Sequence, residues 1–167
     1  MGFGTELLFV VALGLVVLET LRRSLGHTKM SATLEIYTLP AHLLQQFATA
    51  LTRAMERTRV RRVVVESVAF LFKDSIIPPA YLLGRLLFPS IVADSAAMEK
   101  IFAESGLDWT MVRPPELTNK PYTGKYRVRE EHLPAFGFKI SRADVADYMI
   151  KAVEHHLSSC KIVGVSN

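Results

Sequence analysis

The chain has 167 residues, which is enough for one domain with a hydrophobic core. Half of its residues are hydrophobic and 22% are charged, as in an ordinary globular protein. The net charge of +4 favours anionic ligands such as phosphates but does not require nucleic acid, and we expect no nucleic-acid partner. The single cysteine, Cys160, excludes an internal disulfide and indicates a reducing compartment. We therefore expect a cytoplasmic protein in which Cys160 is buried on a final strand.

Residues 1–23 contain an uninterrupted apolar run from Leu7 to Leu18 (LLFVVALGLVVL). Its 12 residues fall short of the roughly 20 that a membrane-spanning helix needs. No Lys or Arg precedes Arg22, so the basic start of a secretory signal is missing as well. We expect a buried strand or helix of the domain, with a membrane-associated helix as the alternative. In that alternative, Arg22 and Arg23 would hold the rest of the chain on the cytoplasmic side.

Two stretches have helical periodicity. The first runs from Ala41 to about Arg57, where apolar residues recur at helical intervals at Leu43, Leu44, Phe47, Leu51 and Met55. The second runs from Ile91 to Glu104, and the residues expected to face inward are Met98, Ile101 and Phe102. Gly106 follows it and can take the left-handed conformation that closes a helix.

A third helix is predicted from the stretch ISRADVA, Ile140 to Ala146. Ser141 is a good N-cap residue, and Asp144, three residues later, is placed to complete a capping box and to oppose the helix dipole. The apolar face continues at Tyr148, Met149 and Val153.

Three short apolar runs predict strands. Val63 to Val65 is β-branched and bounded by charge, and Lys161 to Val165 reads as a final strand. Leu107 to Val112 has the length and composition of a central parallel strand. Pro114 and Pro115 follow it and cannot continue a ladder, so the chain leaves the sheet there, towards the edge where open α/β sheets bind ligands. A turn at Pro121 leads to another short strand that reaches Val128.

Four arginines, Arg57, Arg59, Arg61 and Arg62, form a basic turn before the first of these strands. Such a cluster can grip nucleic acid. The sequence shows no aromatic or recognition-helix pattern beside this cluster. We therefore interpret the arginines as cations near a helix end and in a solvated turn.

Three motifs carry a resemblance to a known family: ESGLDWTMVRPPELT (104–118), Thr123-Gly124-x-Tyr126 and ISRADVA (140–146). They resemble the atypical short-chain dehydrogenase/reductases, in particular the NmrA-like and biliverdin/flavin-reductase-like NAD(P)-binding group. The resemblance implies an α/β fold, a truncated Rossmann-like parallel sheet with flanking helices. It implies a partial NAD(P)-binding domain over residues 24–167, with the glycine-rich first half missing.

The resemblance also implies NAD(P)H as cofactor and a small molecule as substrate. The same resemblance implies that the cofactor lies near Gly26, His27, Thr28, Ser67, Pro114, Pro115, Glu116 and Leu117. The last four of these would line the nicotinamide end. Glu66 stands where the family has the first of two serines, and this departure puts the family's chemistry at that point in doubt. Arg113 could clamp a phosphate, although an ion pair at a strand end is the more usual role.

Several familiar motifs are missing. No G-x-G-x-x-G occurs, and no tyrosine is followed four residues later by lysine, so a catalytic Tyr–Lys pair of the usual kind cannot be assigned. His155 and His156 sit near a helix end without zinc-like spacing to a cysteine or carboxylate, and we expect no metal site. The apolar segment from Ala69 to Pro89 predicts a lid over the site or, equally, a satellite core or oligomer contact.

Two functional hypotheses follow. The first is an oxidoreductase that transfers hydride from NAD(P)H to a small aromatic, flavin or quinone-type acceptor. The second is a non-catalytic remnant of the same fold, a structural or regulatory binding module, with membrane association through Leu7 to Leu18 as an option.

Overall fold

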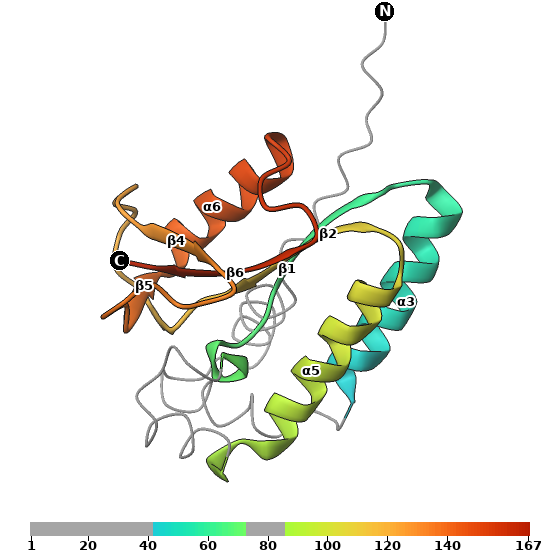
Figure 1. Ribbon diagram of the computed structural model, residues 1–167, viewed down its shortest axis with the longest axis horizontal. Helices are drawn as coiled ribbons and strands as arrows, with labels where there is room; N and C mark the ends of the chain where they lie inside the picture. The colour runs from blue at the N-terminus through green and yellow to red at the C-terminus, as the bar shows by residue number, and fades with distance from the viewer. Residues whose placement is uncertain (1–41, 73–85) are drawn as a thin grey trace, which may run out of the picture.

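The computed structural model describes residues 42–72 and 86–167 (Figure 1). The apolar run Leu7 to Leu18, the loop residues Gly26, His27 and Thr28, and residues 73–85 of the expected lid lie outside the described residues. None of the helices in the described part is long and apolar enough to cross a membrane.

The helices and strands confirm most of the predicted elements and add short ones. In chain order they are α3 (Leu43–Thr58), β1 (Arg62–Glu66), the 3-10 turn η1 (Ala69–Leu71), α5 (Pro89–Glu104), β2 (Asp108–Arg113), β3 (Glu116–Thr118), β4 (Arg127–Glu130), β5 (Lys139–Ser141), α6 (Arg142–Glu154) and β6 (Lys161–Ser166).

Parallel pairing of three strands forms the centre of the main sheet, whose order is β1-β2-β6-β4. Val64 lies opposite Thr110 on β2, and Met111 lies opposite Ile162 on β6. This confirms the prediction of a central parallel strand after Gly106, which has the expected left-handed backbone at φ 68°. Strand β4 is the outer strand of the main sheet and pairs antiparallel with β6. Strands β3 and β5 form a second sheet of two parallel strands.

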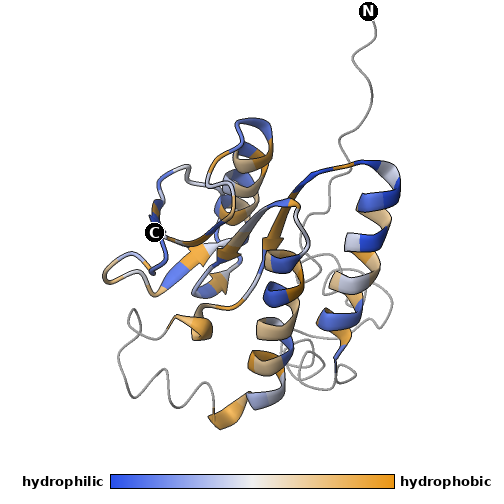
Figure 2. Cartoon of the chain, turned by 45° about the vertical axis from the view of Figure 1, so that its right-hand side comes forward, coloured by the Kyte–Doolittle hydropathy of each residue, from blue (hydrophilic) through white to orange (hydrophobic). Residues whose placement is uncertain are grey.

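Helices cover the two faces of the main sheet, as Figure 1 shows. On one face, Val63 and Val65 pack with Met98 and Phe102 of α5 and with buried residues of α3. On the other face, Val64 belongs to a second core formed with α6. The alternation along β1 follows from the two-residue period of a strand. In Figure 2, α3 and α5 mix hydrophilic and hydrophobic residues along their length, as expected for helices with one buried and one exposed side.

Helix α3 takes its N-terminal cap from another helix. Its own N-cap residue, His42, makes no side-chain hydrogen bond to the helix. Instead, Asp94 of α5 accepts hydrogen bonds from the amides of Leu44 at 2.8 Å and Gln45 at 3.0 Å. The carboxylate satisfies amides that have no partner within the helix and also opposes the positive end of its dipole.

The buried carboxylate of Asp144 ties the start of α6 to a distant loop. The Ser141 side chain accepts a hydrogen bond from the Asp144 amide at 3.0 Å, which confirms Ser141 as the N-cap. The predicted capping-box role of Asp144 is wrong, because its carboxylate accepts from the Ser141 hydroxyl and from the amides of Thr123 and Gly124. Burial opposes ionisation, but these hydrogen bonds outweigh it and lower the pKa of Asp144 to about 2.

Two further predictions need correction. Cys160 is exposed and precedes β6, because the left-handed backbone there (φ 53°) belongs to the tight turn that enters the strand. Its amide bonds the carbonyl of Trp109 at 2.7 Å, while its side chain stays outside the core. The chain leaves the main sheet at the prolines as predicted, but it enters a second sheet at once, because Glu116 and Leu117 belong to β3 and pair with β5.

We expect Asp144→Asn to lower the free energy of unfolding by about 3 kcal/mol at pH 7, because the amide nitrogen that replaces Oδ2 cannot accept the hydrogen bonds from the hydroxyls of Thr123 and Ser141. The wild-type protein should also lose this stabilisation as the pH falls from 3.8 towards 2, since the pKa of Asp144 is depressed. Urea denaturation at several pH values measures both effects. The exposed Glu154→Gln is the matched control, and an equal loss in that variant would contradict the assignment.

Candidate functional site

The carboxyl ends of β1, β2 and β6 meet at one edge of the main sheet, which we call the carboxyl edge. Ser67 follows β1, and its amide donates to the carbonyl of Val112 at 2.7 Å. Pro114 follows β2, and Ser166 ends β6. In open α/β sheets this edge is where ligands bind. The structure therefore brings Ser67 and Pro114, both predicted site residues, to neighbouring positions.

Buried polar atoms without partners gather at the carboxyl edge. Among the described residues, five buried side-chain atoms lack a hydrogen-bond partner, and three of them are Glu66 Oε2, Ser67 Oγ and Ser166 Oγ. The other two lie elsewhere, on Arg62 and Ser95. Most buried polar atoms in proteins are paired, so each exception calls for a physical reason. A ligand bound at this edge that forms hydrogen bonds with the Ser67 hydroxyl and the Glu66 carboxyl group would explain why these atoms have no partner within the protein.

Glu66 combines burial with a shifted pKa. The alternation along β1 directs it to the same face as Val64, towards α6. Burial raises the pKa of its carboxyl group to about 7, and the positive charge of Arg142 at the start of α6 only partly opposes this. The carboxyl group therefore changes its charge near neutral pH.

Arg113 is held by an ion pair beside the same edge. Its Nε donates to Oε1 of Glu99 on α5 at 2.9 Å, and a second nitrogen bonds the other carboxylate oxygen. The guanidinium also lies over the ring of Phe72, 4.6 Å from its centroid. Both charged residues are buried. The interpretation of Arg113 as a strand-end ion pair is confirmed, because Nε and one terminal nitrogen of its guanidinium bind Glu99.

The residues predicted to line the nicotinamide end differ in exposure. Pro114 is buried and Pro115 is half-buried. Glu116 is exposed and pairs with Lys139 at 3.3 Å, whereas Leu117 packs partly against the core under α6. Of these four residues, Pro114 is therefore the most enclosed, and the Glu116 carboxylate lies in solvent.

Glu66 is the residue that sequence reasoning missed as a site candidate. From the sequence, Glu66 is only a departure from the family's serine pair. The signal was nevertheless present, because a carboxylate that directly follows three valines of a buried strand is costly unless it has a role.

A tyrosine and a lysine do meet in space, although not as a poised catalytic pair. Lys151 donates to Asp147 at 2.7 Å and to the hydroxyl of Tyr126 at 3.4 Å. Burial and the Asp147 carboxylate raise the pKa of Tyr126 to about 12. A phenol with this pKa is a weak proton donor at neutral pH, so the cluster is best explained as a support for the loop before β4.

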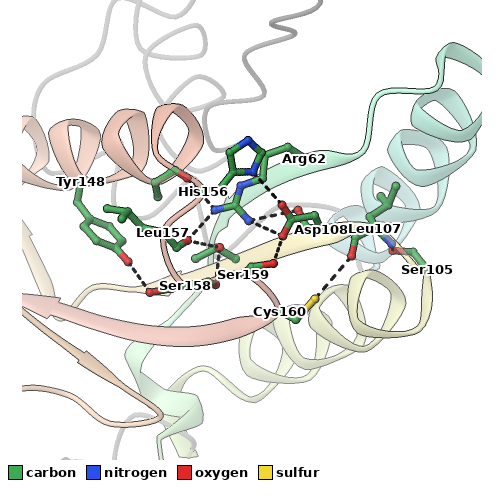
Figure 3. A network of polar contacts seen from close by, with 12 residues as sticks. Arg62, Ser105, Leu107, Asp108, Tyr148, His156, Leu157, Ser158, Ser159 and Cys160 are labelled. Carbon is green, nitrogen blue, oxygen red and sulfur yellow. Dashed lines mark hydrogen bonds and ion pairs between the residues drawn. The ribbon is translucent and has the colours of Figure 1, made fainter.

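The opposite edge of the sheet carries a structural network, drawn in Figure 3. Arg62 bonds Asp108 at 3.0 Å and the carbonyls of Ala152 and Leu157 at 2.8 and 2.7 Å. Burial opposes ionisation of Asp108, but hydrogen bonds from Ser159 and His156 and the charge of Arg62 lower its pKa. Arg62 therefore joins β1, β2 and the end of α6.

Within the described part of the chain, no three His, Cys, Asp or Glu side chains gather as a metal site requires.

We expect Arg113→Met alone to lower the free energy of unfolding by about 3–5 kcal/mol, because it leaves the Glu99 carboxylate buried without a cation. Adding Glu99→Gln should recover most of the loss. Thermal or urea denaturation of the two variants measures the difference, and a double variant as unstable as the single one would contradict this account.

We expect Glu66→Gln to be more stable than the wild-type protein above pH 7, by up to about 3 kcal/mol, and equally stable below pH 4.5. The wild-type carboxyl group is protonated more readily when folded than when unfolded. The contribution of the protonated carboxyl group to the free energy of unfolding is therefore complete below pH 4.5 and is lost as the pH rises to about 7. Urea denaturation of both proteins across this range checks the sign, and parallel pH profiles would refute it.

The described geometry agrees with comparisons to known proteins. Residues 16–156 match the NAD(P)H-binding family. An uncharacterized chloroplastic protein of Arabidopsis thaliana is 38% identical over 90 residues, which are 54% of this chain and 31% of that protein.

Solved structures share the fold. A short-chain dehydrogenase/reductase from Veillonella parvula in complex with NADP has a TM-score of 0.64 at 21% identity, covering 74% of this chain and 58% of that one. A Streptococcus pneumoniae protein proposed to be an NADH-flavin reductase has a TM-score of 0.57 at 15% identity, covering 77% of this chain and 67% of that one. These neighbours confirm the predicted Rossmann-like α/β fold, and the family match confirms the predicted NAD(P)-binding group. The chain belongs to the NAD(P)H-binding family.

Proposed function

We propose that the protein binds NAD(P)H with the nicotinamide at the carboxyl edge and reduces a small aromatic, flavin or quinone-type acceptor. The observation that carries the proposal is the buried, unpartnered hydroxyl of Ser67 at the end of β1, in a chain of the NAD(P)H-binding family. A hydroxyl in this state gains a partner when a ligand with a carbonyl or amide group arrives.

The residues of the described part fit the nicotinamide half of the cofactor. Ser67 would hold the polar group of the ring, and Pro114 and Pro115 would form the apolar wall beside it. Leu117 would extend this wall along β3, and the exposed Glu116 would lie at its outer end. When bound, the cofactor supplies a hydride, and the protein's part is to hold the ring against the acceptor and exclude water.

The phosphate half of the cofactor depends on residues of another kind. The sequence contains no G-x-G-x-x-G, which usually lets the backbone approach the pyrophosphate. Gly26, His27 and Thr28, which the family resemblance places near the cofactor, belong in this proposal to the same binding unit, which spans residues 24–167. Residues 1–23 form a separate apolar segment in this proposal, with membrane association as the alternative to burial.

A second candidate function is a non-catalytic binding module of the same fold. It is favoured by the absence from the sequence of both the glycine-rich motif and the Tyr-x-x-x-Lys pair. The two functions differ in whether NAD(P)H is bound and consumed.

Titration with NADPH, followed by its fluorescence, should give a dissociation constant well below 1 mM, about the weakest that would still support catalysis. NADPH should then be oxidised when FMN or a quinone such as menadione is added. Millimolar binding without oxidation of NADPH would favour the non-catalytic module instead.

Ser67→Ala should raise the NADPH dissociation constant about fivefold, the effect of one lost hydrogen bond of about 1 kcal/mol. Ser95→Ala is the matched control, because Ser95 Oγ is also buried and unpartnered but lies within α5. An equal effect of both substitutions would show that Ser67 acts through stability and not through the ligand.

A further inference from the structure

The end of α3 and the turn into β1 carry a group of exposed arginines. Arg53 and Arg57 are four residues apart and therefore lie on the same side of α3. Arg59 is the C-cap of the helix, and Arg61 directly precedes β1. All four residues are exposed to solvent. We call these residues, Arg53, Arg57, Arg59 and Arg61, the arginine cluster.

Structural roles within the fold do not account for the arginine cluster. Within the described part of the chain, none of its side chains forms a hydrogen bond or an ion pair. The next residue, Arg62, differs, because it binds Asp108 and two backbone carbonyls near the end of α6. Of the cluster, only Arg57 lies in the last turn of α3, where a cation opposes the helix dipole. The other charges are free to act on another molecule.

Few carboxylates offset the arginine cluster. The stretch from Arg53 to Arg61 contains four arginines and one glutamate, so its net charge is +3. On α5, which packs against α3, Glu104 is already paired with Lys100 at 3.8 Å. Figure 2 shows the end of α3 and the turn into β1 largely in blue, the colour of hydrophilic residues. A positive surface of this kind attracts an anionic partner.

The rest of the sequence favours an anionic membrane as this partner over nucleic acid or an acidic protein. The apolar run from Leu7 to Leu18 is too short to span a bilayer and is followed by two further cations, Arg22 and Arg23. Stable attachment to a membrane surface commonly combines an apolar segment with a cluster of basic residues. No aromatic residue lies between Arg53 and Arg61, whereas proteins that grip single-stranded nucleic acid stack its bases on aromatic rings.

We propose that the arginine cluster binds the anionic headgroups of a membrane surface. Its guanidinium groups contact the phosphates and carboxylates of the lipids, and no covalent bond is made or broken. Because Arg61 directly precedes β1, this binding turns the starting edge of the main sheet towards the membrane. The carboxyl edge, at the other end of the strands, then faces away from the lipid. Binding of this kind does not require NAD(P)H.

Co-sedimentation of the whole chain with lipid vesicles tests the proposal. The wild-type protein should bind vesicles of phosphatidylcholine mixed with phosphatidylserine much more tightly than vesicles of phosphatidylcholine alone. About 0.5 M NaCl should release it, since salt screens exposed charges. Changing all four arginines of the cluster to glutamine should weaken binding to the mixed vesicles at least about 25-fold, the effect of two cations at about fivefold each. The melting temperature should not change, because the replaced side chains are exposed.

The matched control removes the same number of positive charges elsewhere. Its four substitutions are Lys120→Gln, Lys125→Gln, Arg129→Gln and Lys139→Gln. These residues are exposed and lie on or near β3, β4 and β5, away from α3 in Figure 1. The control should bind the mixed vesicles as the wild-type protein does, and an equal loss in both variants would overturn the proposal.

Two results for the wild-type protein would also overturn the proposal, and neither depends on how the variants fold. The first is equal binding to vesicles with and without phosphatidylserine. The second is tighter binding to duplex DNA or to polyglutamate than to the mixed vesicles, which would assign the arginine cluster to another kind of polyanion.

Discussion

The parallel pairing of β1, β2 and β6 is the constraint on which the rest of the structure depends. Parallel strands bury both faces, so α3 and α5 must cover one side and α6 the other. The same pairing ends all three strands at one edge and starts them at the other. The starting edge is secured by the Arg62 and Asp108 network, whereas the carboxyl edge retains unpartnered polar atoms. The stabilising network and the proposed ligand site thus lie at opposite edges of one sheet.

The sequence predicted the long helices and the central strands because their signals are local. Periodicity placed α3 and α5, Gly106 marked a helix end, and the prolines marked the exit from β2. The errors concern contacts between distant segments. The partners of Asp144 on a loop about twenty residues away cannot be deduced from capping rules, and Cys160 depends on the geometry of a tight turn. At the site, the family motif pointed to Ser67, but only packing revealed the buried state of Glu66.

Glu66 and the Arg113–Glu99 pair show two ways in which this fold treats buried charge. The ion pair is satisfied by two hydrogen bonds and an aromatic ring, and it holds α5 to the end of β2. Oε2 of Glu66 has no such partner, and burial lowers the cost by raising the pKa of the carboxyl group to about 7, so that it is largely protonated below neutral pH. The first arrangement supports a rigid wall, and the second leaves a group whose charge can change. Natural proteins commonly accept local instability of this kind where function needs it.

The capping of α3 by Asp94 has a consequence for how the domain folds. A helix of this length with no cap of its own is marginal in water, and its first turn is completed by a residue about fifty positions later in the chain. We expect α3 to fray until α5 has docked against it, so that the two helices become ordered together. This long-range coupling raises the contact order of the domain, which slows folding and makes it cooperative. A fragment that ends before α5 would therefore lose α3 as well.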